Sequence, residues 1–501
     1  MNRPLFLAAG LASSVSLSFG QNPQVDEINN AYGLSQSELV RIEMNGSLGQ
    51  DMIASLVIDG RDERLLLTPK SVRAEGFQVL AQQEDGSLVS VDPGPVSTYA
   101  GVIGGIPGTQ VVGGMQDSGL FAKVVMPDSR VMWLQPINRE FPAAEQDTYV
   151  LYDEDHIIED ASARCGTAPG PISTTGSLVG PTTSAAGNLQ VAELACDTDH
   201  EYFLDYGTIT NTSNRIQNVI GTMNLQYESQ VNLTHLITTI IVRSTPADPY
   251  TSSDAGTLLT QFQNEWTTAQ AGVPRDIAHI FTGRNINGGT IGIAFLGAIC
   301  SFGFGYGMVE SDFNNVFACA TDLSAHELGH NWGGNHCSCT NATMNPFITC
   351  ANNFNMFSIN EITAFAASIG CLSDAGIGTN FCVANPNSTG MTGSLEASGS
   401  TSISTDDLTL TASGVPDQAG IFIQGTQQAQ TPLGDGFLCV GGSIVRLTVP
   451  ITTLGNEATF FLPLTGISPG ETLQFQFWFR DPPAGGAGFN FTEGLEITFT
   501  N

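Results

Sequence analysis

Residues 326–336 read HELGHNWGGNH, and this stretch decides the local fold and the chemistry that the chain can carry. Three of the seven histidines of the chain fall within it. His326 and His330 are four residues apart, so on an α-helix their imidazoles lie one turn apart on the same face. Gly333 can adopt the left-handed conformation that ends a helix, and the chain can then turn back to bring His336 beside the first two rings. The spacing predicts three imidazoles around one metal ion.

The residue between the first two histidines matters as much as the ligands. Three histidine ligands leave one tetrahedral position open, which is typical of catalytic rather than structural zinc. Zinc lowers the pKa of a bound water to about 7, so hydroxide is available near neutral pH. Glu327 lies at the edge of the same helix face, where its carboxylate can accept the water proton and pass it to a leaving amine. The stretch therefore predicts a zinc site with its own general base, suited to the hydrolysis of peptide bonds.

The region 193–374 resembles the metzincin zinc endopeptidases, and within them the adamalysin (reprolysin) group, because the full HExxHxxGxxH pattern is present. The resemblance implies that the three histidines of the motif bind zinc and that Glu327 is the catalytic base. It also implies that Met344, in the stretch ATMNP over 342–346, forms the methionine turn beneath the metal. An ordinary core methionine is the alternative for Met344, and it differs little because the family role is itself packing.

Two apolar stretches precede the motif. Residues 276–283 read DIAHIFTG and residues 288–295 read GGTIGIAF, which resembles the adamalysin pair of strands before the active-site helix. The second is the edge strand of that family, and an exposed edge is a template for an extended polypeptide substrate, here along Ile291 to Phe295. His279 in the first strand, like His200 and His235, is interpreted as a structural residue rather than a ligand.

The resemblance also implies a calcium site. Glu193, Asp276 and Asp374 stand at positions that match a site near the domain ends in adamalysins, and oxygen ligands suit Ca²⁺. The chain carries 48 acidic residues, however, so three such side chains are also expected without a bound cation.

The first twenty residues have the features of a secretory signal peptide. Arg3 gives a positive start, residues 5–17 form an apolar core, and Ser18 and Gly20 are the small residues expected before a cut ahead of Gln21. The apolar run is too short for a comfortable membrane span, and no later segment is apolar enough. The sequence predicts a secreted, extracellular protein.

The charge balance limits the partners. There are 16 basic and 48 acidic residues, for a net charge of −32. Phosphate binding needs clustered lysine and arginine, so neither nucleic acid nor an anionic membrane is an expected partner. The expected partner is an extended polypeptide substrate, and the sequence indicates no oligomeric state.

Residues 21–188 are predicted to form a β-rich propeptide with a linker. Apolar residues alternate or run between turn residues over 51–67 and 87–91. The stretch YAGVIGGIP over 99–107 resembles a strand-and-turn pattern of adamalysin propeptides. Residues 167–188 carry no charge and are rich in Gly, Pro, Ser and Thr, which predicts an open linker. This linker lacks a multibasic processing site, so self-cleavage or another extracellular protease is expected to cut it.

Cys165 is followed by Gly166 near the end of the predicted propeptide. In the family that the chain resembles, such a cysteine can bind the catalytic zinc and fill its fourth position. The alternative is that Cys165 is one half of a disulfide. The count does not decide between them: of ten cysteines nine remain when Cys165 is set aside, so one more thiol stays unpaired.

Residues 189–376 are predicted to form the zinc metallopeptidase domain, of α/β class. A buried strand is predicted over 235–242. Apolar residues at helical spacing predict helices after an N-cap at Ser213, over 253–269, from about Asn315 through the motif, and over 358–369 before a stop at Gly370.

Six cysteines cluster around the motif, and disulfides that fasten the loops below the metal are predicted for them. A second metal site is the alternative, but two cysteines separated by one residue have poor spacing for zinc. The six are Cys300, Cys319, Cys337, Cys339, Cys350 and Cys371.

Residues 377–501 are predicted to form an antiparallel β-sandwich accessory domain. Apolar and polar residues alternate over 473–479 and 495–500. Cys382 and Cys439 are the candidates for its disulfide. Trp478 and Phe479 are interpreted as core residues, with an exposed aromatic platform as the alternative.

The predicted fold class is multidomain: a β-rich propeptide, an α/β metzincin-like catalytic domain and a C-terminal antiparallel β-sandwich. The predicted function is a secreted zinc-dependent endopeptidase made as a zymogen. The main alternative is a secreted adhesion or ligand-binding protein with a vestigial protease domain, which the C-terminal domain motivates and the intact Glu327 disfavours. An exopeptidase is a further alternative, but no residue indicates capture of a free terminus.

Overall fold

The computed structural model describes residues 23–168, 170, 189–374, 376–399, 401–403 and 406–499. The predicted signal peptide over 1–20 and most of the predicted linker, residues 169 and 171–188, lie outside the described residues.

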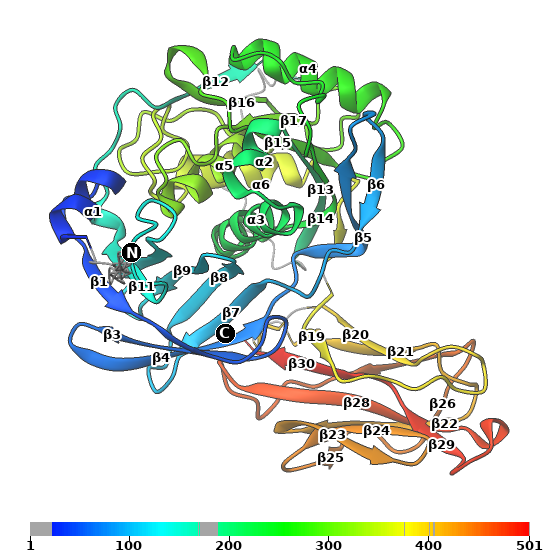
Figure 1. Ribbon diagram of the computed structural model, residues 1–501. Coiled ribbons are helices and arrows are strands. Elements are labelled where there is room, and N and C mark those ends of the chain that lie inside the picture. Colours follow the sequence, from blue (N-terminus) through cyan, green and yellow to red (C-terminus); the bar gives the residue numbers. More distant parts are fainter. Residues whose placement is uncertain are drawn as a thin grey trace, which may run out of the picture.

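The N-terminal region, residues 23–168, is built on a nine-stranded antiparallel sheet (Figure 1). One face is buried and the other is exposed in strands such as β3, where Met52, Ala54, Leu56 and Ile58 point into a core of their own. This period-two pattern confirms the predicted β-rich character. In sheet order the strands are β1 (Glu38–Arg41), β11 (Thr148–Asp153), β10 (Val131–Pro136), β9 (Gly119–Val125), β8 (Gln110–Gln116), β7 (Thr98–Ile103), β4 (Arg61–Pro69), β3 (Met52–Ile58) and β2 (Glu43–Asn45), with helices α1 (Val25–Tyr32) and η1 (Glu154–His156) beside them.

The central region, residues 189–374, contains a second sheet with helices on its faces (Figure 1). Its strands are β13 (Gln190–Thr198), β14 (Leu233–Val242), β15 (Ile277–Phe281), β16 (Thr290–Phe295), β17 (Tyr306–Val309) and β18 (Ser373–Asp374). Its helices are α2 (His200–Tyr206), α3 (Ile209–Val231), α4 (Ala255–Thr268), η2 (Asn287–Gly289), α5 (Phe317–Asn331) and α6 (Met356–Ala366). Strands β14, β13, β15 and β17 run parallel, and β16 is antiparallel to β17. An α/β arrangement is what the sequence predicts for this region.

The central sheet takes strands from the N-terminal region at both of its edges. β5 (Arg73–Gln82) pairs in parallel with β14, and β6 (Leu88–Val91) pairs with β5. At the other edge, β12 (Arg164–Ala168) pairs in parallel with β16. The prediction that Ile291 to Phe295 form an exposed edge is therefore corrected, because β12 already occupies that edge in this chain. Pairing between strands more than a hundred residues apart is not visible in local sequence patterns.

Helix α3 lies between the two sheets and joins the regions. It contacts β7, β8 and β9 on one side and β14 on the other (Figure 1). The N-cap is Thr208, whose side chain accepts a hydrogen bond from the backbone N–H of Asn211, so the predicted cap at Ser213 is wrong and lies inside the helix. One continuous core includes side chains of both regions, among them Phe121, Trp133, Ile220 and Phe317.

The other helices lie close to their predicted places. α4 begins after its N-cap Asp254, and α5 begins two residues after Asn315. α6 already ends at Ala366, so Gly370 is not its stop. Among the described residues, no helix is both long and apolar enough for a membrane span.

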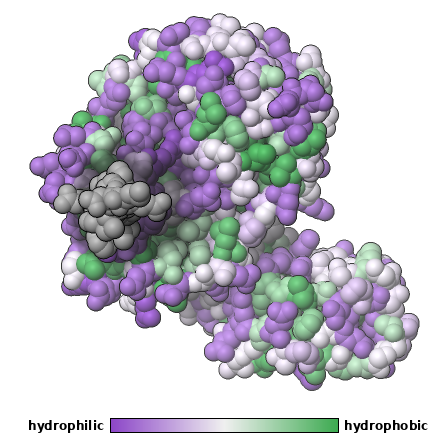
Figure 2. Space-filling model, viewed as in Figure 1, coloured by the Kyte–Doolittle hydropathy of each residue, from purple (hydrophilic) through white to green (hydrophobic). Residues whose placement is uncertain are grey.

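In the C-terminal region, residues 376–499, the described elements are strands apart from one short 3₁₀ helix, and the region forms a separate lobe in the space-filling view (Figure 2). Two of its three antiparallel sheets share one core in which Phe475, Phe477 and Phe479 are buried, and Trp478 packs half-buried against Phe489. The strands are β19 (Thr379–Phe381), β20 (Ser394–Ser398), β21 (Thr409–Ser413), β22 (Ala419–Gly425), β23 (Gln427–Leu433), β24 (Gly436–Gly441), β25 (Val445–Arg446), β26 (Ile451–Thr452), β27 (Glu457–Phe461), β28 (Thr472–Arg480), β29 (Phe489–Phe491) and β30 (Gly494–Thr498), with η3 (Pro482–Ala484) before β29.

The predicted disulfides are present. The six cysteines around the motif pair as Cys300–Cys371, Cys319–Cys350 and Cys337–Cys339, and Cys382 pairs with Cys439. Cys165 and Cys196 keep free thiols. The alternative in which Cys165 belongs to a disulfide is therefore not the arrangement in this structure.

Candidate metal centre

Helix α5 presents the first two histidines and the glutamate of the motif together. His326, Glu327 and His330 are fully buried on it. Gly333 follows the helix with φ +81°, the left-handed conformation that the sequence predicts for it. The backbone N–H of Gly334 then bonds to the carbonyl of Gly329, and the chain turns back toward the helix.

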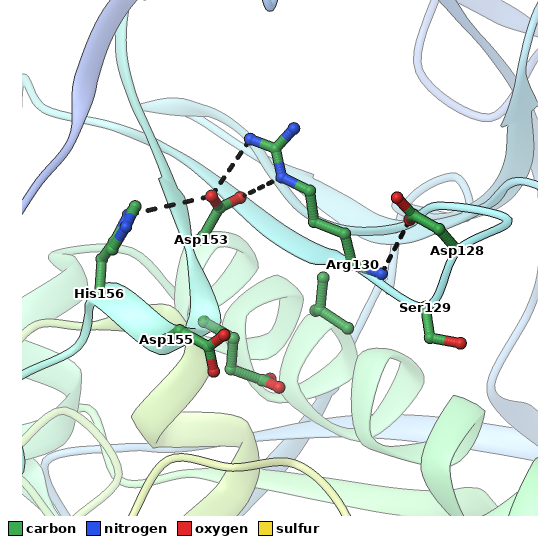
Figure 3. A pocket seen from close by; sticks show the side chains of 8 residues that line it. Asp128, Ser129, Arg130, Asp153, Asp155 and His156 are labelled. Carbon is green, nitrogen blue, oxygen red and sulfur yellow. Dashed lines mark hydrogen bonds and ion pairs between the residues drawn. The ribbon is translucent and has the colours of Figure 1, made fainter.

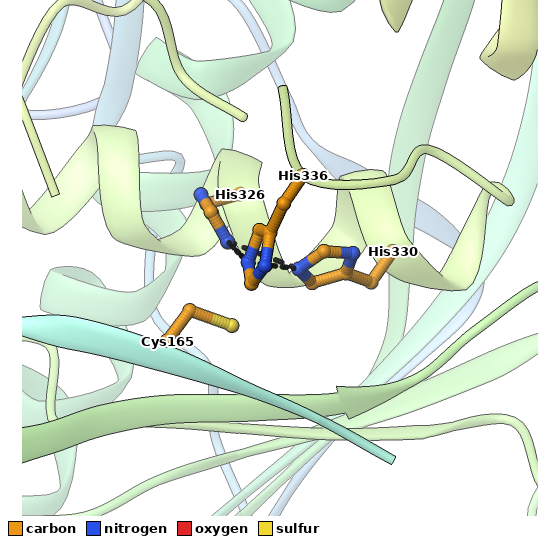
Figure 4. A group of neighbouring side chains, drawn as sticks. All are labelled: Cys165, His326, His330 and His336. Atoms are coloured by element: carbon orange, nitrogen blue, oxygen red, sulfur yellow. Dashed lines mark hydrogen bonds between the residues drawn. The ribbon is translucent and has the colours of Figure 1, made fainter. Parts of the chain in front are cut away.

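The three imidazoles converge on one point. Their Nε2 atoms lie 3.0 Å (His326 to His330), 3.2 Å (His326 to His336) and 3.1 Å (His330 to His336) apart (Figure 4). Four tetrahedral bonds of about 2.0–2.1 Å from a zinc ion place ligand nitrogens about 3.3 Å apart. The arrangement fits one tetrahedral metal ion.

The opposite ring nitrogens show which atoms carry the protons. Nδ1 of His326 faces the carbonyl oxygen of Thr343, and Nδ1 of His330 lies 2.7 Å from the carbonyl oxygen of Gly334. A carbonyl oxygen only accepts, so both Nδ1 atoms donate, and in the neutral rings Nε2 then carries a lone pair. Lone pairs that face one another repel, and a cation between them removes that repulsion.

Burial keeps the rings neutral. It lowers the pKa of His330 to about 3 and the pKa of His326 well below its usual value, with the neighbouring imidazoles adding to both shifts. Burial also lowers the pKa of His336. Neutral imidazole is the form that binds a metal.

A carboxylate that the sequence did not single out fixes the backbone behind His326. Asp322, one turn earlier on α5, accepts hydrogen bonds from the Thr343 hydroxyl at 2.7 Å and from the backbone N–H of Asn352 at 3.0 Å. The carbonyl oxygen of the same Thr343 accepts a hydrogen bond from Nδ1 of His326. Such outer contacts orient metal-binding imidazoles.

Glu327 is a buried carboxylate to which no N–H or hydroxyl of the described residues donates. Burial raises its pKa well above the usual value, and the neighbouring thiol of Cys165 has the smaller, opposite effect. Gly292 on β16 makes room for it, because a Cβ at that position would lie 2.2 Å from Oε1 of Glu327. An orphaned buried carboxylate indicates a missing partner such as water, a metal or a substrate.

Cys165 reaches the same point from strand β12. Its Sγ and one nitrogen of each of the three histidines all lie within 4.8 Å of one another, and the side chain points toward the rings (Figure 4). Burial, and then the charge of nearby Glu327, raise the pKa of this thiol. The β12 segment also bonds to the chain after Met344: the N–H of Cys165 to the carbonyl of Pro346, and the N–H of Ile348 to the carbonyl of Ala163, each at 3.0 Å.

Met344 lies under the helix, as the resemblance implies. Its side chain is fully buried, and a Cβ at Gly329 of α5 would come within 2.5 Å of its sulfur. The glycine in the middle of the motif therefore lets the methionine pack against the helix between the two histidines.

His279, His235 and His200, interpreted from the sequence as structural residues, are not part of the cluster that the motif histidines form. His279 bonds through Nε2 to Asn331 at 2.8 Å, and His235 accepts from the indole N–H of Trp332 at 2.9 Å and contacts Asn224. His200 is partly buried at the start of α2.

The implied calcium site stays a prediction. The carboxylate of Asp276 accepts a hydrogen bond from the backbone N–H of Glu193 at 2.8 Å, and β18, which ends at Asp374, pairs with β13. The side chain of Asp374 lies outside the described residues. The remaining neighbours of Asp276, Cys300 and Cys371, are joined in a disulfide and offer no thiolate.

A polar pocket of about 390 Å³ lies elsewhere, in the N-terminal region (Figure 3). Arg130 spans it and pairs with Asp153 at 2.8 Å and with Asp59 at 2.7 Å. Glu154 lines the pocket, and burial raises its pKa to about 7.

Two comparisons with known proteins match the region around the centre. Residues 213–337 match the family model described as Metallo-peptidase family M12B Reprolysin-like. The snake venom metalloproteinase trimerelysin-2 of Protobothrops flavoviridis is 37% identical over 79 residues, which cover 15% of this chain and 39% of the relative. The chain thus spans less than half the length of that relative. The part of the chain that carries the three histidines is therefore similar to the adamalysin/reprolysin-like metzincins.

Proposed function

We propose that this protein is a secreted zinc-dependent endopeptidase, made as a zymogen, in which Glu327 is the general base. The observation that carries the proposal is the convergence of three neutral imidazoles beside one buried carboxylate to which no N–H or hydroxyl of the described residues donates. A structural zinc site has no need for that carboxylate. The predicted signal peptide and the four disulfides support export to an oxidising compartment.

The histidines and Glu327 have separate roles in the proposed reaction. His326, His330 and His336 would hold zinc, which supplies a Lewis acid for the scissile carbonyl and for water. Glu327 takes a proton from the attacking water and returns it to the leaving amine, and its burial raises its pKa toward the range in which a group can do both. The substrate would lie extended beside β16, where the backbone of β12 now lies.

The zymogen proposal follows from β12. Its backbone is bonded on one side to β16 and on the other to the chain at Pro346 and Ile348, so it fills the groove between them. The sulfur of Cys165 on this strand lies within 4.8 Å of one nitrogen of each of the three histidines, which supports a role as the fourth ligand. A cut in the linker after residue 168, followed by removal of β12, would open both the groove and the fourth position.

Turnover and metal content test the function together. The matured protein is expected to cleave a denatured protein substrate such as casein, to lose this activity with a zinc chelator, and to regain it with added zinc. Glu327→Gln, matured like the wild type by an added protease that cuts the linker, is expected to keep about one zinc per chain and to lose activity by about 10²–10⁴-fold. Glu228→Gln is the matched control, because that carboxylate faces Lys70 at 2.8 Å rather than the histidines.

Two results would count against the proposal. Full activity in Glu327→Gln would show that another group is the base. A folded, matured wild-type protein that binds zinc but cleaves nothing would favour the adhesion or ligand-binding alternative.

A further inference from the structure

The active-site helix lacks a cap from its own sequence. α2, α3, α4 and α6 each begin after a residue whose side chain accepts a first-turn N–H: Asp199, Thr208, Asp254 and Asn355. α5 begins after Val316, which has no side-chain acceptor. The free N–H groups of a helix start need partners, most of all where the helix is buried, as α5 is.

The missing acceptor comes from the N-terminal region. The backbone N–H of Phe317, the first residue of α5, donates to Oε1 of Gln135 at 2.9 Å. Nε2 of the same side chain donates to the carbonyl of Asn315 at 3.0 Å. Gln135, on strand β10, thus bonds to the chain on both sides of the helix start, 180 residues away in sequence.

Burial and hydrogen bonds fix the orientation of the Gln135 side chain. The side chain is buried, and Oε1 accepts a second hydrogen bond, from the hydroxyl of Tyr152 on the neighbouring strand β11, at 3.0 Å. Because Oε1 faces two donors and Nε2 faces a carbonyl, the hydrogen bonds define which way the amide points.

The ring of Phe317 is held by the same strands. It is fully buried and packs edge-on against Phe121 of β9, with ring centres 5.4 Å apart, and against Trp133 of β10, at 5.6 Å. The guanidinium of Arg215 on α3 lies 5.0 Å from the ring centre of Phe121 and 4.9 Å from that of Phe317. The N-terminal region therefore contacts both the backbone and the side chain of the first helical residue.

We propose that the N-terminal region completes the active-site helix, and that Gln135 is a positioning residue that caps α5 from another part of the chain. His326 follows Phe317 by nine residues on the same helix, so the region that fills the groove at one end of the site also holds the start of the helix that carries two of the histidines. When the N-terminal region leaves, the Phe317 N–H and ring lose their partners, and the first turn of α5 loosens. The inference depends on the proposed zymogen only in that this region is removed.

Hydrogen exchange in the full-length precursor tests the cap. The precursor carries Glu327→Gln in every sample so that it stays intact. Adding Gln135→Leu is expected to speed exchange in peptides that cover residues 316–322 by about fivefold, the equivalent of about 1 kcal/mol for a lost cap, while peptides of β13 and β14 stay unchanged. Adding Gln135→Glu keeps the acceptor for the Phe317 N–H, and its buried carboxyl, in the protonated form, also keeps a donor for the carbonyl of Asn315, so exchange is expected to remain close to that of the parent. Gln110→Leu, at an exposed position of β8, is the control and changes nothing.

The outcomes separate the cap from general packing and from catalysis. Unchanged exchange at 316–322 in Gln135→Leu, or equal acceleration in Gln135→Glu, would overturn the proposal. If Gln135→Leu does not fold, the precursor and the matured protein are compared instead, and the same peptides must exchange faster after the N-terminal region has left. Equal exchange in the two forms would also overturn it. None of these measurements uses peptidase activity, so they test the cap even if the protein proves to have no such activity.

Discussion

Gly292 leaves the space that the side chain of Glu327 occupies. A Cβ at Gly292 would lie 2.2 Å from Oε1 and 2.9 Å from Cγ of that side chain. Gly292→Ala is therefore expected to displace the carboxylate and to lower kcat/KM of the matured protein by at least about tenfold, because small misplacements of a reacting group have large effects on rate. Zinc content should not change.

The matched control for this change lies in the next loop. Gly303→Ala introduces a Cβ with no heavy atom within 4 Å, so activity should stay at the wild-type level. Wild-type kcat/KM in Gly292→Ala would mean that the glutamate side chain tolerates another position and that β16 does not define it.

Cys165 is the second residue whose removal has a defined consequence. Burial raises the pKa of this thiol, so only a neighbouring cation would hold it as a thiolate. Cys165→Ala removes the proposed fourth ligand and weakens the attachment of β12, which still lies beside β16, so the intact precursor is expected to cleave a short fluorogenic peptide slowly before the linker is cut. Cys196→Ala, which removes the other free thiol, is the control and should leave the precursor inactive. A silent Cys165→Ala precursor would show that the pairing of β12 with β16 blocks the groove without the thiol.

At this scale the sequence predicted how the motif brings its three histidines and Glu327 together, because i, i+4 spacing and a glycine turn are local geometry. The position of Met344 was implied by the resemblance to a family. The residues that support them were not predictable. Gln135, Gly292 and Asp322 gain their roles from contacts with other parts of the chain, and no local pattern marks them.

Among the elements, helix α5 is tied to the segment after the methionine turn by the disulfide Cys319–Cys350. It closes a loop with a sequence separation of 31 residues, so its loss is expected to destabilise the protein by about 3–4 kcal/mol. The double variant Cys319→Ala/Cys350→Ala should unfold at a lower temperature and should release zinc faster to a colourimetric chelator, since both zinc-binding helix and turn are loosened.

The disulfide Cys382–Cys439 in the C-terminal region provides the comparison. Cys382→Ala/Cys439→Ala removes a disulfide from a separate core and should leave the rate of zinc release unchanged. Equal zinc release from both double variants would show that Cys319–Cys350 does not support the centre.

Element boundaries show where local signals were sufficient. Asp254 and Asn355 are side-chain caps, and the helices that they begin fall within a few residues of the predicted spans. For α3 the apolar spacing alone suggested Ser213, whereas the true cap Thr208 lies before a mostly polar first turn in which Thr210 is exposed and only Thr212 is buried. Such a turn contributes little to the hydrophobic periodicity by which a helix start is recognised.

For the molecule as a whole, Glu154 makes the precursor sensitive to pH. Burial raises its pKa from 4.5 to about 7, against the opposing effects of Lys123 and of a hydrogen bond from Trp133. The folded state therefore binds a proton that the unfolded state releases between about pH 4.5 and 7. The contribution of this group to stability is present at low pH and is lost as pH rises through that window, by about 1–3 kcal/mol.

Urea unfolding of the precursor at pH 5 and at pH 8 checks this sign. Glu154→Gln keeps an acceptor for the indole N–H of Trp133 at the same place but does not titrate. The loss of unfolding free energy from pH 5 to pH 8 should be smaller in the variant than in the wild type. An equal loss in the two proteins would assign the pH dependence to other buried carboxyls, such as Asp199 and Glu310.

Strands β12 and β5 have a further consequence for the proposed removal of the N-terminal region. They pair with opposite sides of one sheet, β12 with β16 and β5 with β14. Removal of the N-terminal region therefore exposes β16, which can then bind a peptide, and also exposes β14, which has no proposed substrate. Unsatisfied backbone groups along β14 would pair with any suitable strand, including that of a second molecule. We therefore expect freshly matured protein to self-associate more readily than its precursor as concentration rises.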